Sequence, residues 1–98
     1  MDTRALHDET SRTDLLHRLR RAEGQLRGVQ RMIEEGEDCM HIAQQIAAVR
    51  RALDSAYVRM TVCFMEQELS SRMRDAKGRA PDFGELLGNI ETLLSKVR

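Results

Sequence analysis

The chain has 98 residues, 16 basic and 16 acidic side chains, and only 3% aromatic residues. A chain of this length forms one domain and buries a limited share of its surface when it folds alone, so we expect an obligate oligomer with an aliphatic core. The zero formal net charge neither indicates nor excludes nucleic-acid binding, because clustering of charge on one face decides phosphate binding. No apolar run approaches the ~20 residues of a membrane span, and the N-terminus lacks a secretory apolar core, which predicts a cytoplasmic protein.

The first predicted helix covers residues 13–36. Residues 1–12 are polar and without periodicity, so we expect a mobile tail there. Thr13 is the predicted N-cap, with Asp14 in the first turn, and Gly36 is the predicted stop. Between them apolar residues recur at alternating spacings of four and three, which is typical of a helix with one buried side. This apolar seam consists of Leu15, Leu19, Ala22, Leu26, Val29 and Ile33.

The other side of this helix is basic. It carries His17, Arg18, Arg20, Arg21, Arg27 and Arg31, against a single acidic residue, Glu23. Gly24 and Gly28 lie among these residues, and each costs about 1 kcal/mol relative to Ala in a helix interior. Such a cost indicates that another backbone, either a packed helix or a phosphate chain, approaches closely. A purely solvated basic face, or a face that pairs with acidic residues of other subunits, is the plainer interpretation of the arginines.

The second predicted helix covers residues 38–72, with Asp38 as its cap and Arg50 and Arg51 adding to the basic residues. Its apolar seam consists of Cys39, Ile42, Ile46, Val49, Leu53, Ala56, Met60 and Cys63. A second apolar row, formed by Ala43, Ala47, Tyr57 and Phe64, lies beside that seam. The wide apolar face predicts packing against more than one neighbouring helix.

Both cysteines of the chain lie on this second seam. They are 24 positions apart, which is roughly 36 Å along a helix, so they cannot touch within one copy. An antiparallel second copy of the helix would bring Cys39 of one chain towards Cys63 of the other, at two equivalent sites. In a reducing compartment such thiols are typically reduced, metal-binding or redox-reactive.

The third predicted helix covers residues 82–97, after a polar break at 70–81 that contains Gly and Pro. Asp82 and Glu85 have the spacing of a capping box, and the apolar residues that follow lie along one side. These are Phe83, Leu86, Leu87, Ile90, Leu93, Leu94 and Val97. Residues 13–98 are thus expected to form a single all-α domain. The sequence shows no pair of nucleophile and base, so an enzyme is not expected.

Two segments carry a resemblance to a known family. RLRRAEGQLRGVQRMIEEGEDC (18–39) and QQIAAVRRAL (44–53) resemble the CsoR/RcnR-like bacterial transcriptional repressors, which include copper, nickel/cobalt, formaldehyde and persulfide sensors. The resemblance implies an antiparallel four-helix dimer core, a homotetramer built as a dimer of dimers, and binding to operator double-stranded DNA that an effector weakens. By matching position it implies DNA contacts from Arg18, Arg20, Arg21, Arg27, Arg31, Arg50 and Arg51.

The resemblance also implies an effector site across the dimer, built from Cys39 of one subunit and residues 25 and 29 positions later in its partner. Those positions hold Phe64 and Glu68. Phe64 cannot bind a metal, and Glu68 offers a hard oxygen poorly suited to Cu(I). Cys63 lies one residue before the usual second position. His7, His17 and His41 are further candidates for accessory ligands.

Two kinds of effector fit this set of residues. One is a metal ion, Cu(I), Ni(II) or Zn(II), held by Cys39 with Cys63 or a histidine. The other is a covalent thiol modification by reactive sulfur, an oxidant or an electrophile. The sequence therefore predicts a thiol- or metal-sensing DNA-binding repressor, and a helical adaptor protein without DNA binding is the alternative.

Overall fold

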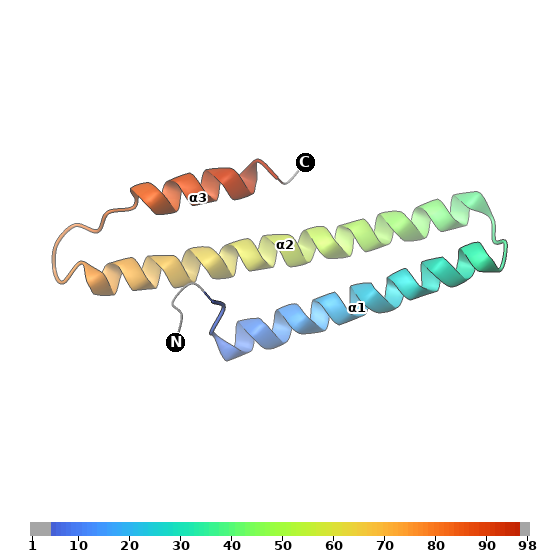
Figure 1. Ribbon diagram of the computed structural model, residues 1–98, viewed down its shortest axis with the longest axis horizontal. Helices are drawn as coiled ribbons and strands as arrows, with labels where there is room; N and C mark the ends of the chain where they lie inside the picture. Colours follow the sequence, from blue (N-terminus) through green and yellow to red (C-terminus); the bar gives the residue numbers. More distant parts are fainter. Residues whose placement is uncertain (1–4, 97–98) are drawn as a thin grey trace. The chain divides into compact units, whose positions relative to one another are not determined.

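The computed structural model describes residues 5–96, and all regular structure in this range is helical. The helices are α1 (Glu9–Glu34), α2 (Cys39–Asp75) and α3 (Gly84–Leu94) (Figure 1). The predicted all-α fold class is confirmed. The chain divides within α2 into two compact units, Met1–Val58 and Arg59–Arg98. Over residues 5–96, no helix is both long enough and apolar enough to cross a membrane.

The start of α1 is set by Asp8 rather than by Thr13. The Asp8 carboxylate accepts a hydrogen bond from the Ser11 backbone N–H at 2.9 Å, and Glu9 places a second negative charge in the first turn. Both favour a helix N-terminus. The predicted cap at Thr13 is therefore wrong, and residues 9–12, expected in the tail, are helical. Residues 1–4 of the predicted tail lie outside the described residues.

The link between α1 and α2 follows the predicted turn chemistry. Gly36 adopts a φ of 70°, and the N–H groups of Gly36 and Glu37 return to carbonyls of the last turn of α1 at 3.2 and 3.0 Å. This is a Schellman ending. Asp38 then accepts a hydrogen bond from the His41 backbone N–H at 3.1 Å. The stop at Gly36 and the cap at Asp38 are confirmed, and the short link makes α1 and the first half of α2 an antiparallel pair (Figure 1).

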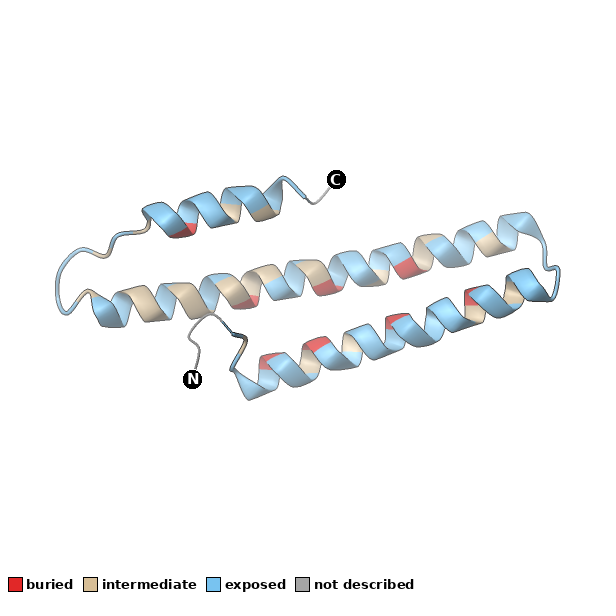
Figure 2. Cartoon of the chain, in the orientation of Figure 1, coloured by how far each residue is buried: buried red, intermediate tan, exposed pale blue. Residues whose placement is uncertain are grey.

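Within the first unit, each apolar seam is only half buried. On α1 the seam members at seven-residue intervals are buried, and on α2 Val49 and Ala56 are buried whereas Ile42 is half-buried. Five members between them are 42% to 58% exposed (Figure 2). The helix pair therefore covers one row of each seam and leaves the other row uncovered in a single chain. The buried set is Leu15, Ala22, Val29, Val49 and Ala56, and the exposed set is Leu19, Leu26, Ile33, Ile46 and Leu53.

The second unit contains the rest of α2, a loop at 76–83, and α3. The loop turns at Lys77 and Gly78, whose φ angles are 50° and 86°, and α2 continues to Asp75, three residues beyond its predicted end. In α3, Leu86 is buried. Residues 97–98 lie outside the described residues.

The predicted capping box of Asp82 and Glu85 is wrong. The N-cap position of α3 is Phe83, without a side-chain capping bond. Asp82 instead accepts a hydrogen bond from the Gly84 N–H, two residues later, at 2.9 Å. Glu85 contacts Arg72 of α2, so its carboxylate is drawn away from the helix start.

Candidate functional site

A group of arginines projects from the first unit into solvent. These residues come from α1 and α2, all are exposed, and none forms an ion pair with another described residue. We call them the six-arginine group: Arg20, Arg21, Arg27, Arg31, Arg50 and Arg51. Helical spacing places Arg20, Arg27 and Arg31 on one stripe of α1. Their guanidinium groups remain available to an anionic partner.

The two glycines among these arginines have open surroundings. A Cβ added at Gly28 would meet nothing within 4 Å, and one at Gly24 would meet only the Arg27 guanidinium, at 3.9 Å. The close backbone approach predicted from these glycines is therefore not made by the described part of the chain itself.

Arg18 differs from the other predicted DNA-binding arginines because it is already engaged. Its Nε donates to Asp14 at 2.9 Å, and its Nη1 donates to the Ser55 hydroxyl of α2 at 2.9 Å. The Arg18 and Asp14 side chains are 39% and 40% exposed. Arg18 therefore ties α1 to α2. Sequence reasoning missed Ser55, although the four-residue spacing of Asp14 and Arg18 is a signal for a helical ion pair.

Cys39 is the first residue of α2 and is exposed. Beside it, His41 Nδ1 lies 3.3 Å from Glu37 Oε2, and the His41 backbone N–H is bonded to Asp38. No three His, Cys, Asp or Glu side chains gather to hold a metal anywhere in the described range 5–96. The surroundings of Cys39 in one chain thus supply a single accessible thiol and an incomplete ligand set.

The remaining predicted effector residues lie in the second unit. Cys63 is buried, with 3% of its surface exposed. Phe64 and Glu68 are half-buried, and Glu68 Oε2 accepts a hydrogen bond from Arg72 Nη2 at 3.4 Å. Glu68 is therefore held by a cation of its own helix. Arg72 was not singled out from the sequence, although its spacing from Glu68 indicates such a pair.

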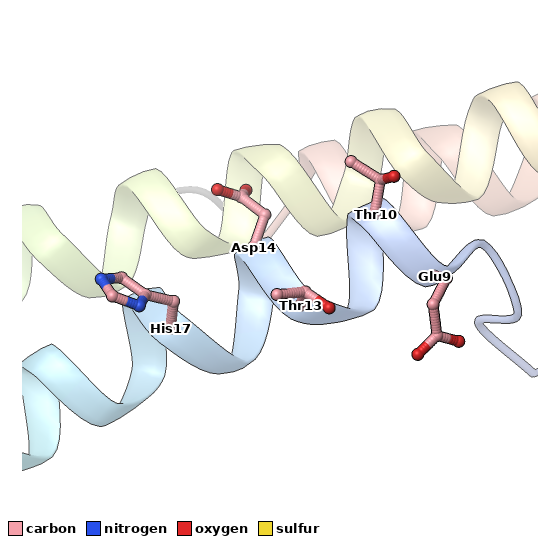
Figure 3. A pocket seen from close by; sticks show the side chains of 5 residues that line it. All are labelled: Glu9, Thr10, Thr13, Asp14 and His17. Carbon is pink, nitrogen blue, oxygen red and sulfur yellow. The ribbon is translucent and has the colours of Figure 1, made fainter.

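Among residues 5–96, neither of the two histidine candidates near the N-terminus belongs to a group of three metal-binding side chains. His7 is exposed and precedes α1. His17 lines a shallow hollow of about 500 Å³ beside the first turns of α1, together with Glu9, Thr10, Thr13 and Asp14 (Figure 3). The five side chains spread along the helix and do not converge on one point. The hollow therefore does not form a metal site.

One carboxylate at this end of the chain has a shifted pKa. Hydrogen bonds from Ser11 lower the pKa of Asp8 below its ordinary value of 3.8, because they favour the ionised form that accepts them. Asp8 is therefore ionised near neutral pH, and its charge contributes to the capping of α1.

Fold and site together define an all-helical protein with exposed arginines on one unit and an accessible thiol at a helix start. Comparison with known families gives the class a name. Residues 11–96 match the model of the family described as metal-sensitive transcriptional repressors. The chain belongs to this family, that of CsoR and RcnR, which confirms the resemblance drawn from its sequence.

Three relatives illustrate the relationship. The chain is 50% identical over 52 residues to the copper-sensing transcriptional repressor RicR of Mycobacterium tuberculosis, a match that covers 52% of the chain and 54% of RicR. It is 46% identical over 39 residues to the copper-sensing repressor CsoR of Bacillus subtilis, covering 40% of the chain and 39% of CsoR. It is 30% identical over 81 residues to an uncharacterised Serratia marcescens protein from the bioA 5′ region, covering 83% of the chain and 89% of that protein. No solved structure matches the chain significantly.

Proposed function

We propose that this protein is a cytoplasmic, homotetrameric repressor that binds operator double-stranded DNA and is released by an effector sensed at Cys39. The observation that carries the DNA-binding part is the six-arginine group, whose members are exposed and form no ion pair within the described chain. Arginine binds phosphate oxygens in bidentate fashion and remains charged at all physiological pH values. Membership in a family of transcriptional repressors supports the same function.

The DNA-binding proposal is tested with two matched single substitutions. Arg27→Ala removes a member of the six-arginine group, and Arg74→Ala removes an exposed arginine of the last turn of α2. We expect Arg27→Ala to weaken operator binding and to lower the slope of log affinity against log salt by about one for each phosphate that the variant no longer binds. Arg74→Ala should bind as the wild type does. Salt-independent or absent DNA binding by the folded wild type would favour the helical adaptor instead.

We place the effector site between subunits, with Cys39 of one subunit and Cys63 of its partner as the two thiols. Three observations support this placement. Cys39 is exposed, Phe64 has no donor atom, and Glu68 is held by Arg72. Among residues 5–96 of one chain no three donors gather to hold a metal, so a metal effector would be held by Cys39 together with Cys63 of the partner subunit or with a histidine. Two thiolates suit a soft ion such as Cu(I), and they also react with sulfur species or electrophiles.

Mass spectrometry of the reduced protein separates these effectors. The protein is exposed in turn to Cu(I), Ni(II), Zn(II), formaldehyde and inorganic polysulfide, with free thiols counted after each treatment. An inter-subunit link between Cys39 and Cys63 after polysulfide supports thiol-based sensing, and stoichiometric metal with both thiols protected supports metal sensing. Cys39→Ser should abolish either response, whereas Cys63→Ser should spare only modification by an electrophile. A response that survives Cys39→Ser contradicts the proposed site.

A further inference from the structure

The second unit contains one arginine that joins two helices. Arg72 of α2 contacts Glu68 one turn earlier, with Nη2 at 3.4 Å from Oε2. The same Nη2 lies 3.6 Å from Glu85 Oε2 in the first turn of α3, and Nη1 donates to the Asp82 carbonyl at 3.2 Å. One guanidinium thus holds a carboxylate of α2 and two groups at the start of α3.

Helix α3 has few other means of staying in place. It has 11 residues and no side-chain cap, and isolated helices shorter than about 12–15 residues are marginal in water. Leu86 is its one buried residue over the described range, and Leu87 and Leu94 are 63% and 60% exposed. Ile90 and Leu93 are half-buried, so the apolar side of α3 is only partly covered, and polar contacts at its start add to its docking.

The ion pairs of Arg72 differ from the exposed pairs that contribute little to stability. The Arg72 and Glu68 side chains are only 21% and 20% exposed, and Arg72 Nε is buried without a partner in the described chain. The side chain is thus held in a largely desolvated position, where loss of one partner leaves the other charge uncompensated. Glu85 is 74% exposed, so its ion pair with Arg72 contributes less to stability than the pair of Arg72 with Glu68.

We infer that Arg72 is an electrostatic clamp that fixes the start of α3 on the second half of α2. Phe64, Glu68 and Arg72 follow one another at four-residue spacing on α2, and all three are half-buried. Glu68 accordingly serves to hold Arg72 and is not an effector ligand. Opening of the clamp frees α3 and the 76–83 loop. This inference concerns the second unit and does not depend on DNA binding.

Limited trypsin digestion of the full chain tests the clamp. The loop contains the trypsin sites Lys77 and Arg79. Proteolysis follows the population of locally opened forms, so faster cleavage at these sites than in the wild type reports loosening of the loop and α3. Arg72→Met keeps the apolar stem and removes the charge, and Arg74→Met is the matched control two residues away. We expect Arg72→Met to be cleaved in the loop about tenfold faster than the wild type, in line with loss of a charge-assisted hydrogen bond, and Arg74→Met to be cleaved at the wild-type rate. Equal cleavage of the two variants would overturn the clamp.

Two further measurements keep the inference testable if Arg72→Met does not fold. Glu68→Gln removes only the charge that faces Arg72, so its loop should also be cleaved faster, and a wild-type rate would contradict the clamp. Amide hydrogen exchange of α3 is measured in rising salt. Exchange in the wild type should accelerate as the ion pairs are screened, whereas exchange in Glu68→Gln should respond less. An identical salt response in both proteins would overturn the role of the ion pairs.

Discussion

Arg18 and Arg72 have the same local arrangement. Each pairs with an acidic residue four positions earlier and then reaches a second helix, Arg18 at Ser55 and Arg72 at the start of α3. A long guanidinium side chain can satisfy a helical neighbour and still span to another element, because its donors form a rigid fork. The role of an arginine in this protein therefore depends on its partners as well as on its place along the basic side of α1.

Substitution of Arg18 should mainly affect stability, whereas substitution of Arg20 should mainly affect DNA binding. Arg18→Met should lower the free energy of unfolding by about 0.5–1 kcal/mol, because it removes partly exposed hydrogen bonds from a charged donor to Asp14 and Ser55. Arg20→Met should leave stability unchanged and weaken DNA binding. Urea denaturation at one fixed protein concentration measures the first effect, and operator titration the second. If Arg18→Met were as stable as the wild type and its DNA affinity fell as far as that of Arg20→Met, Arg18 would be a phosphate ligand.

The Asp8 cap predicts a pH dependence at the start of α1. Because the folded state lowers the pKa of Asp8, the cap stabilises the helix fully above the ordinary value of 3.8 and loses this contribution as the pH falls through the lower, folded value. Amide exchange or NMR of residues 9–12 should therefore show fraying that grows as the pH falls below 3.8. Asp8→Asn keeps a capping oxygen without the titrating charge, so fraying of its first turn with the same pH profile would contradict this cause.

At the level of the helices, the end of α1 depends on the backbone conformation of one glycine. Gly36 has a φ of 70°, where a side chain costs roughly 1–2 kcal/mol. Gly36→Ala should therefore lower the free energy of unfolding by about this amount. Gly28→Ala is the control, because Gly28 has a helical φ and an added Cβ meets nothing within 4 Å; it should be neutral or stabilising. Denaturant titrations compare the two, and equal effects would rule out the proposed cause.

The helices were predictable from local signals, and the errors had local causes. The 3,4 periodicity identified all three helices. Gly36 suits a helix stop because it has no side chain, and Asp38 suits a cap because its carboxylate can accept a backbone hydrogen bond. The cap at Thr13 was wrong because Asp8, within the predicted tail, offers an equally good capping oxygen and a negative charge. The box at Asp82 failed because Glu85 is drawn to Arg72, a contact between helices that local spacing does not reveal.

At the scale of the whole molecule, the alternating burial of the seams indicates what a second copy would cover. Leu19, Leu26 and Ile33 of α1, with Ile46 and Leu53 of α2, form exposed rows beside buried ones. The sequence identified these residues as apolar, but it could not say which row faces the chain's own partner helix. That division is a property of tertiary packing. The exposed rows support the proposed four-helix dimer core.

Leu53→Glu tests this assembly. Leu53 is 42% exposed in the single chain, so the charge should be tolerated by a monomer and should disrupt an interface that buries it. We expect sedimentation to show a smaller species than the proposed wild-type tetramer. Gln44→Glu adds the same charge at an exposed position on the other side of α2 and should leave the mass unchanged. A Leu53→Glu protein with the wild-type mass would contradict the proposed interface.

The candidate site was predictable only in part, because some of its contacts depend on tertiary packing and on assembly. Exposure of the six-arginine group follows from its place on the polar sides of amphipathic helices. Cys39 lies on an apolar seam, and its exposure was not predicted. The pair of Glu68 and Arg72 is indicated by its four-residue spacing on α2. The further contacts of Arg72 with Asp82 and Glu85 depend on the docking of α3, and the proposed approach of Cys63 to a second chain depends on assembly. Neither of these can be obtained from spacing along one helix.

The most direct test of the proposed repressor is the affinity of the reduced protein for operator DNA, measured by fluorescence anisotropy at one salt concentration with and without Cu(I) or inorganic polysulfide. Wild-type affinity should fall by about 5–150-fold with one of the two, since an effector that prefers the DNA-free form must weaken DNA binding by the same coupling factor. Cys39→Ser should bind DNA as the wild type does and should not respond. Absence of DNA binding, or an equal response in Cys39→Ser, would contradict the proposal.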